Sequence, residues 1–243
     1  MRNFVTLTRR ELLSVFVSPL AYVTASMFLF VFGLIFFSRL TASRIVSVET
    51  LIDPMGYVLP VLLGPVLTMR LLAEERRMGT LEALMTAPVG DAEVVLSKFA
   101  GVLIFYASTT ALTLLHAVLM VYYSSGPVDF GSFANGYLGI LLFAALFLAF
   151  GLLASSCFES PVLAALVSFV CGLTLLMISI VTASPVFLKP GISHDIFQFL
   201  MPVPHFKNFY GGAMDTRDVA YFTLTTAYLL FLTTKVLESR KWR

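Results

Sequence analysis

The chain has 243 residues, of which 58% are hydrophobic and only 12% are charged, and its formal net charge is +2. A soluble domain carries about 25% charged residues, so this chain has too little polar surface to face water on all sides. The composition excludes a large separate soluble domain and gives no reason to expect nucleic-acid binding. It predicts a single-domain, all-α, polytopic membrane protein over 1–243, with the lipid bilayer as its main environment.

The first segment, 3–18, is amphipathic rather than membrane-spanning. Leu12 and Phe16 can share one face of a helix while Arg10 lies on another, a pattern typical of a helix in the membrane interface. Pro19 is expected to end this helix. The apolar run that follows is too long for a signal peptide, so we expect the segment to be retained.

Six apolar stretches then approach the ~20 residues that are needed to cross a bilayer. Pro60 and Pro65 lie in the second stretch and predict a kink there. An even number of spans places both termini on one side of the membrane. The predicted spans are near 20–38, 55–73, 99–122, 136–154, 161–182 and 219–237.

The basic residues are distributed unevenly between the two sides. Eleven of the 16 Lys and Arg residues fall on the side of the termini, and the positive-inside rule therefore places both termini in the cytoplasm. Those eleven are Arg2, Arg9, Arg10, Arg70, Arg76, Arg77, Lys98, Lys235, Arg240, Lys241 and Arg243.

The longest segment on the other side, 183–216, contains four prolines but also many large apolar residues. A solvated loop does not need them, so we expect short, semi-buried helices before the sixth span. Asp215 or Thr216 can cap that span, and Asp218 lies in its first turn. Asp53 is interpreted as a solvated loop charge just before the second span.

The charged segment, which we define as 73–88, follows the second span directly. The second-span helix is expected to continue to about Met78 and to end at Gly79. Because Pro88 stops further helix, local chemistry predicts a separate short helix over 81–86, lying across the end of the bundle.

Two further residues favour that short helix. Thr80 is a good N-cap, and Glu82 lies in the first turn, where a carboxylate complements the helix dipole. The segment is either an ordinary solvated loop that follows the positive-inside rule or a docking surface for a soluble partner. Its charged side chains can pair with one another or with that partner.

The stretch from Glu75 to Val89, ERRMGTLEALMTAPV, resembles the E-[RK]-[RK]-x-G-T-L-E-x-L-[LM]-[TS]-x-P motif of ABC type 2 transporter permeases. The layout of an interfacial helix, six spans and a semi-buried outer segment is similar as well. More narrowly, 18–23, 204–212 and 214–222 resemble the gliding-motility (GldF-like) permease subgroup.

This resemblance implies a transmembrane ABC permease of the bacterial inner membrane, with export as the family expectation. It implies a separate ABC ATPase subunit, a second permease copy or a related permease, and an additional subunit with an extracytoplasmic domain. The short helix would be a coupling helix that docks on the ATPase. The docking role falls on Glu74, Glu75, Arg76, Arg77, Gly79, Thr80, Leu81 and Glu82.

The chain contains no G-x-x-x-x-G-K-[ST] phosphate loop, so we expect no enzymatic activity and no cofactor in this chain, with ATP bound by the partner. His116, inside the third span, either lines the pore or forms an interhelical hydrogen bond. No metal site is expected, since His194 and His205 lack a local ligand cluster. Glu159, in the tight turn after the fourth span, is interpreted as a helix cap or surface charge.

Two other functions are weighed against a permease. An intramembrane enzyme would need paired aspartates, a Ser–His pair or an H-E-x-x-H helix, and the spans contain almost no ionisable residues beyond His116. A secondary transporter or channel without an ATPase partner usually shows intramembrane charges or paired broken helices. Only the second span, with its two prolines, fits that description weakly.

Overall fold

The computed structural model describes residues 2–43, 48–80, 90–123, 129–182, 196–197, 199–211 and 215–239, and all regular structure in these ranges is helical. The all-α prediction is confirmed. The helices are α1 (Arg2–Val17), α2 (Pro19–Ser43), α3 (Val48–Thr68), α4 (Ala73–Arg77), α6 (Asp91–Leu112), α7 (Leu114–Tyr123), α8 (Phe130–Cys157), α9 (Pro161–Thr182), α11 (Pro202–Tyr210) and α12 (Thr216–Ser239).

Within the described residues, six helical stretches are long and apolar enough to cross a membrane, as predicted. The fifth, α9, has the predicted bounds, and the others begin earlier or end later than the apolar runs alone suggest. The second differs most, because α3 already starts at Val48. Asp53 therefore lies inside a helix, and its interpretation as a loop charge is wrong. The α3 helix continues through Pro60 to Thr68, and a kink at its prolines stays a prediction.

The third span is divided at Thr113, which separates α6 from α7. The Thr113 side chain is fully buried. Its hydroxyl donates to the Thr110 carbonyl at 2.5 Å and lies 3.0 Å from the hydroxyl of Tyr137 on α8. The break is therefore held by a contact with a neighbouring helix, which a hydropathy profile does not detect.

The centre of the bundle is α8. In the most apolar stretch of α8, 72% of the residues are buried. In the corresponding stretches of α2, α9 and α12, 28% of the residues are buried. Small residues let neighbours approach closely, as is common in membrane helices. A Cβ at Gly139 would meet the Phe209 side chain at 2.9 Å, and one at Gly151 would collide with Thr68. The α3, α6, α9 and α12 helices pack against α8, and α2 packs against α3. The outer helices present apolar side chains outward.

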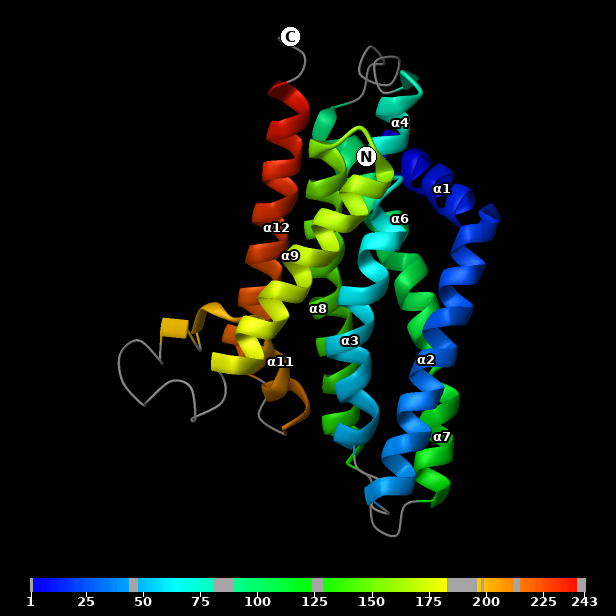
Figure 1. Ribbon diagram of the computed structural model, residues 1–243, viewed down its shortest axis with the longest axis vertical. Helices are drawn as coiled ribbons and strands as arrows, with labels where there is room; N and C mark the ends of the chain where they lie inside the picture. Colours follow the sequence, from blue (N-terminus) through cyan, green and yellow to red (C-terminus); the bar gives the residue numbers. More distant parts are fainter. Residues whose placement is uncertain are drawn as a thin grey trace.

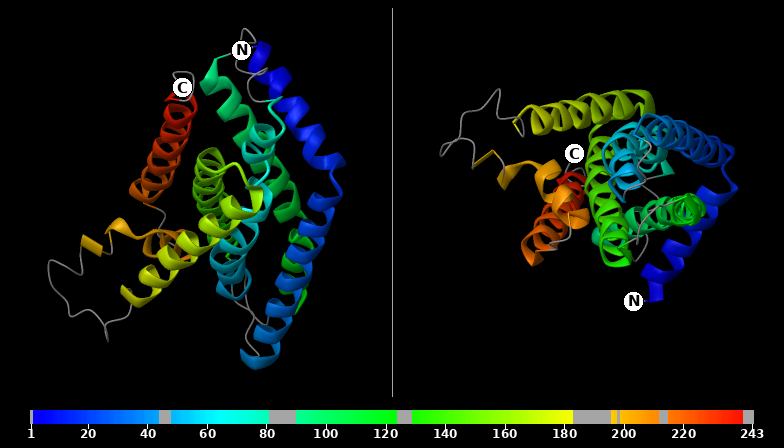
Figure 2. Two further views of the ribbon diagram at one scale, coloured as in Figure 1. Left: turned by 45° about the horizontal axis from the view of Figure 1, so that its top comes forward. Right: turned by 90° about the horizontal axis from the view of Figure 1, so that it is seen from below.

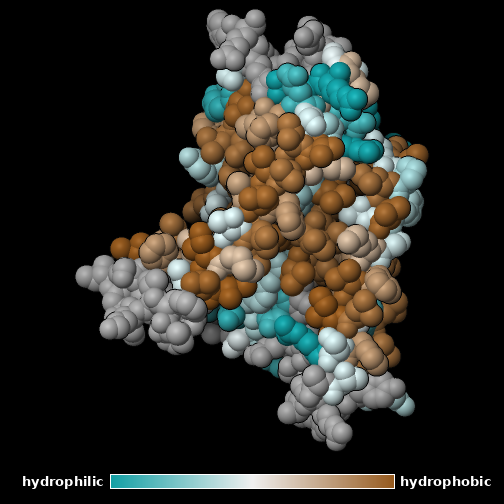
Figure 3. All heavy atoms as spheres, in the orientation of Figure 1, coloured by the Kyte–Doolittle hydropathy of each residue, from teal (hydrophilic) through white to brown (hydrophobic). Residues whose placement is uncertain are grey.

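Figures 1 and 2 show the start of α1, the end of α12 and α4 at one end of the bundle, called here the terminal end. The end of α2, the start of α3, the end of α7 and the start of α8 lie at the opposite end. In the face shown in Figure 3, hydrophobic residues cover the middle and hydrophilic residues gather toward the terminal end and again near the opposite one. This banding is what a bilayer-spanning bundle requires.

The predicted interfacial helix corresponds to α1, which ends at Val17 and is followed by α2 from Pro19, the expected breaking residue. It packs against α6. Phe16 contacts Phe105 edge-on, with ring centroids 5.3 Å apart. The predicted semi-buried outer helices include α11, which packs against α3, α8, α9 and α12. Residues 183–195 of that segment lie outside the described part of the chain.

Candidate functional site

The charged segment begins with a break that the sequence did not predict. We expected one helix to about Met78, but α3 ends at Thr68 and a turn precedes the short helix α4. The Ser155 hydroxyl of α8 accepts hydrogen bonds from the backbone N–H groups of Leu72 (3.2 Å) and Ala73 (3.0 Å) and donates to the Met69 carbonyl (3.1 Å). A fully buried serine from another helix thus caps α4, because the side chain of its N-cap residue, Leu72, has no hydrogen-bonding group.

The end of α4 follows the prediction. Gly79 adopts a positive φ of 71°, the left-handed conformation that favours glycine at a helix C-terminus. Its N–H donates to the Arg76 carbonyl at 3.2 Å. The Thr80 hydroxyl donates to the Glu75 carbonyl at 3.2 Å, so in the described residues it closes the end of α4. The crosswise helix predicted over 81–86, with Leu81 and Glu82, lies outside the described residues, and the N-cap role of Thr80 stays a prediction.

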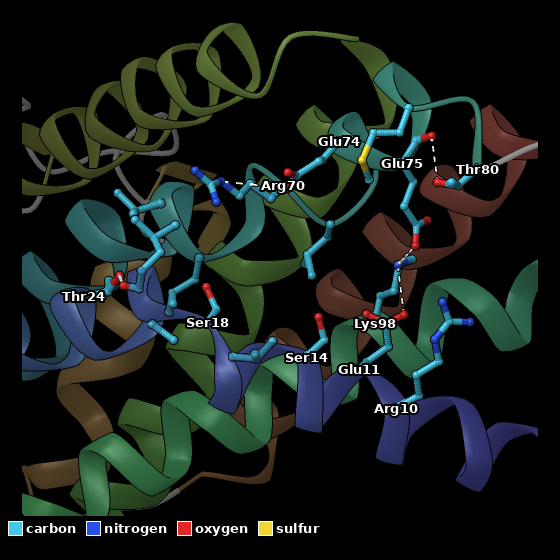
Figure 4. A pocket seen from close by; sticks show the side chains of 17 residues that line it. Arg10, Glu11, Ser14, Ser18, Thr24, Arg70, Glu74, Glu75, Thr80 and Lys98 are labelled. Carbon is cyan, nitrogen blue, oxygen red and sulfur yellow. Dashed lines mark hydrogen bonds and ion pairs between the residues drawn. The ribbon is translucent and has the colours of Figure 1, made fainter.

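The most buried charge at the site belongs to Lys98 of α6, whose side chain is 2% exposed. Its Nζ donates to Glu75 Oε1 of α4 at 2.7 Å and to Glu11 Oε1 of α1 at 3.1 Å. Figure 4 shows Lys98 between the two carboxylates. One side chain therefore connects three elements that are far apart in the sequence. Sequence reasoning counted Lys98 only as a charge on the side of the termini.

A second ion pair connects α4 to the turn between α8 and α9. Arg76 donates to Glu159 Oε1 at 2.7 Å and to the Cys157 carbonyl at 3.2 Å. Glu159 is 73% exposed, as expected for a surface charge. An exposed pair of this kind contributes about 0–1 kcal/mol, so its main effect is to fix the position of α4.

The predicted docking residues therefore separate into two groups. Glu75 and Arg76 turn toward the bundle and hold α4 in place, whereas Arg77, Gly79 and Thr80 are exposed. Glu74 is half-buried and lies 3.9 Å from Arg70, a loose contact one helical turn away. Among the described residues of this segment, Arg77 is exposed and Met78 is 62% exposed.

His116 lies away from this site, near the start of α7. Its ring packs edge-on against Phe32 and Phe36 of α2, with centroid distances of 4.9 and 5.5 Å. The ring thus fills a space between two helices. A pore-lining role for His116 stays a prediction.

At the opposite end, α11 carries a second polar cluster. His205 Nδ1 lies 2.6 Å from Asp218 Oδ1, and the Asn208 amide donates to Asp218 Oδ2 at 3.0 Å. Asp218 was predicted only as a first-turn charge of the last span. Asp215, predicted as a cap, does accept from the Arg217 N–H at 3.0 Å.

Asp53 belongs to a neighbouring group at the same end. It accepts from the Tyr210 hydroxyl at 2.5 Å and from Arg39 at 3.3 Å, and Tyr57 lies 3.1 Å from Tyr210. Burial, and after it the hydrogen bond to Asp53, raise the pKa of the Tyr210 hydroxyl well above its usual range. Tyr210 therefore stays protonated and fastens α11 to α3. Among the described residues, no group of three His, Cys, Asp or Glu side chains could hold a metal ion.

Two comparisons with known proteins bear on this site. The model of one family, described as ABC-2 family transporter protein, matches residues 16–237, which include the six spans and the whole charged segment. No curated protein matches the chain.

Proposed function

The chain belongs to the ABC-2 family of transporter proteins, and we propose that this transmembrane permease is driven by a separate ABC ATPase that docks on the charged segment. ATP would be bound by that partner. The chain would work with a second permease copy or a related permease, and export is the direction that we propose.

The observation that carries the proposal is the division of α4 into an anchored side and an exposed side. Glu75 and Arg76 fix the helix to the bundle, while Arg77, Met78 and Thr80 face outward. A loop that served only to connect two spans would not need three separate anchors. A receiving surface needs both rigid support and a free face.

The anchors also supply a route for mechanical coupling. Lys98 connects α4 to α1 and α6, and Ser155 connects it to α8. A displacement of α4 by a closing ATPase would therefore pass to several spans together, as a rigid-body movement rather than a local bend.

The orientation of the chain in the membrane is also part of the proposal. The basic residues of the terminal end satisfy the positive-inside rule, which supports a bacterial inner-membrane protein with cytoplasmic termini. The subgroup resemblance over 204–212 and 214–222 supports a place near the gliding-motility permeases and an additional subunit with an extracytoplasmic domain.

The test is co-purification from native membranes with a tagged chain. We expect the wild type to bring with it a polypeptide that contains a phosphate-loop motif, identified by mass spectrometry, and ATP hydrolysis in the eluate. In the described residues no ion pair involves Arg77, so Arg77→Glu reverses an exposed charge without breaking an anchor. It should lower the recovered ATPase at least about tenfold, as expected for the loss of one or two charged contacts.

The matched control is Lys207→Glu, an exposed charge reversal on α11 at the opposite end. It should leave recovery of the ATPase unchanged. A wild-type chain that transports without any ATP-hydrolysing partner would overturn the proposal and favour a secondary transporter or channel.

A further inference from the structure

A cavity of about 780 Å³ lies at the terminal end, between α1, α2, α6 and the junction of α3 with α4. Figure 4 shows its lining, with Glu75, Lys98 and Glu11 on one side and Ser18 and Thr24 on the other. Its volume is within the roughly 300–1,000 Å³ of small-molecule sites. Neither the permease role nor the docking of an ATPase requires such a space.

The lining is amphipathic. The part formed by α2, the end of α1 and the membrane portion of α3 is mainly apolar, and the part formed by α4, α6 and the rest of α1 is charged. The apolar residues are Val15, Leu20, Ala21, Val66, Leu67 and Leu71. A ligand that fits both parts must have a polar head and a hydrocarbon portion.

The charged part has an excess of negative charge where it is most buried. Lys98 is a single cation between two carboxylates, Glu11 and Glu75. Only Oε1 of Glu75 is used in that contact. Its Oε2 is buried and has no hydrogen-bond partner among the described residues. A buried carboxylate oxygen without a donor is costly, and a donor that also carries positive charge satisfies both its hydrogen bond and the net charge.

Cationic groups lie elsewhere on the same lining. Arg10 is exposed on α1, and the Arg70 side chain is 52% exposed with only a 3.9 Å contact to Glu74. Figure 4 shows Arg10 on the same side of the cavity as Glu11 and Lys98 and Arg70 across from them, so Arg10 is the cation accessible to an anion beside this cluster. Arginine suits phosphate, because its planar group offers several donors at once.

We propose that this cavity binds a phospholipid with a primary ammonium headgroup, of the phosphatidylethanolamine type. The ammonium donates to Glu75 Oε2 within the negative field of Glu75 and Glu11, the phosphate lies near Arg10, and the upper acyl chain follows the apolar lining. The position agrees with this ligand, because α1 and α4 lie where hydrophilic residues replace the hydrophobic band (Figures 1 and 3).

The wild-type protein allows the most direct test, because the lipid can be varied instead of the chain. Purified protein in detergent is titrated with phosphatidylethanolamine, its N,N,N-trimethyl analogue phosphatidylcholine, and phosphatidylglycerol, all with identical acyl chains, and bound lipid is counted by native mass spectrometry. The trimethylated head keeps its charge but has no N–H to donate. Phosphatidylethanolamine should bind at least about tenfold more tightly than either other lipid, the effect of one charge-assisted hydrogen bond.

Equal binding of phosphatidylethanolamine and phosphatidylcholine would overturn the proposal. Soluble O-phosphoethanolamine, added in excess, separates the two sources of the same head group. It should fail to displace the lipid, because it lacks the hydrocarbon portion that the apolar lining requires. Full displacement would contradict the lipid assignment.

Variants then locate the site. Glu75→Gln risks misfolding because it alters the main partner of Lys98, whereas Glu11→Gln leaves Lys98 paired with Glu75. Glu11→Gln and Arg10→Gln should each reduce phosphatidylethanolamine binding several-fold. Glu93→Gln, on α6 but outside the lining, should bind as the wild type does. Unchanged binding in both Glu11→Gln and Arg10→Gln would place the lipid elsewhere and overturn the proposal.

Discussion

The two ends of this bundle are held together by different mixtures of contact, since α11 combines polar contacts with close aromatic packing. At the terminal end, α4 is anchored by ion pairs and by a serine cap, through Lys98, Arg76 and Ser155. At the opposite end, α11 is inserted among aromatic rings, with Phe206 5.2 Å from Phe143 and 5.1 Å from Tyr57 between ring centroids.

This difference corresponds to what each end can do. Ion pairs and a capped five-residue helix keep a small element in place while leaving its outer face free for a partner. Close aromatic packing instead closes the opposite end, because dense cores resist gradual deformation. Under the proposed function, the terminal end would receive the force of the ATPase, and the densely packed opposite end would respond as a unit.

The largest effect is expected from Lys98→Met, which keeps the side-chain volume but leaves Glu11 and Glu75 facing each other without a cation. Removing one partner of a buried ion pair costs about 3–5 kcal/mol, and the partial exposure of the two carboxylates places this case near 3. The free energy of unfolding is measured by SDS titration in mixed micelles. Lys235→Met, which breaks the exposed Lys235–Glu238 pair, should cost at most about 1 kcal/mol. Equal losses would mean that the Lys98 network does not hold the terminal end.

At the opposite end, Gly56→Ala tests the aromatic packing. A Cβ at this position would collide with the Phe206 ring, so the ring or α11 must shift, at a cost of about 1–3 kcal/mol. Gly33→Ala is the matched control, because its Cβ would meet only His116 Nε2 at an ordinary 3.8 Å. Thermal unfolding followed by intrinsic fluorescence should separate the two variants, and a Gly56→Ala protein as stable as Gly33→Ala would refute the close packing of α11.

A smaller effect is expected from Ser155→Ala, which removes the acceptor for the N–H groups of Leu72 and Ala73. Losing a helix cap costs about 1 kcal/mol. Hydrogen exchange of peptides that cover 69–77 should accelerate without a comparable change in α9. Ser97→Ala, which removes a buried hydroxyl that donates to the Val94 carbonyl of its own helix, is the control. Unchanged exchange over 69–77 would show that the break after α3 does not depend on Ser155.

The smallest stability change should come from Glu159→Gln, which weakens an exposed contact with Arg76 by less than about 1 kcal/mol. If the pair mainly positions α4, ATPase recovery in the co-purification should fall more than stability does. Normal recovery of the ATPase by this variant would mean that Lys98 and Ser155 position α4 without help from Glu159.

The spans could be read from the sequence because each is a run of apolar residues of the length that a bilayer imposes. Gly79 could be read because a helix end favours glycine in the left-handed conformation. The break at 69–72 could not be predicted from the sequence, since none of the residues from Met69 to Leu72 interrupts a helix by itself. The turn is stabilised by Ser155, more than eighty residues later in the chain.

Lys98 and Asp53 were missed for a related reason. Each was assigned by its side of the membrane, whereas its environment depends on tertiary partners, Glu11 and Glu75 for the lysine and Tyr210 for the aspartate. One local signal existed for the lysine. It lies one helical turn after Val94 and Val95, on the buried face of α6, where a charge must find a partner.

The account depends most on the docking of an ATPase at α4, and site-specific photo-cross-linking tests it most directly. A photoreactive phenylalanine analogue at Met78, exposed beside Gly79, should cross-link to the co-purified ATP-hydrolysing subunit on irradiation of the complex. The same analogue at Lys207, at the opposite end, should not. Cross-linking of the ATPase from Lys207 but not from Met78 would contradict the central claim.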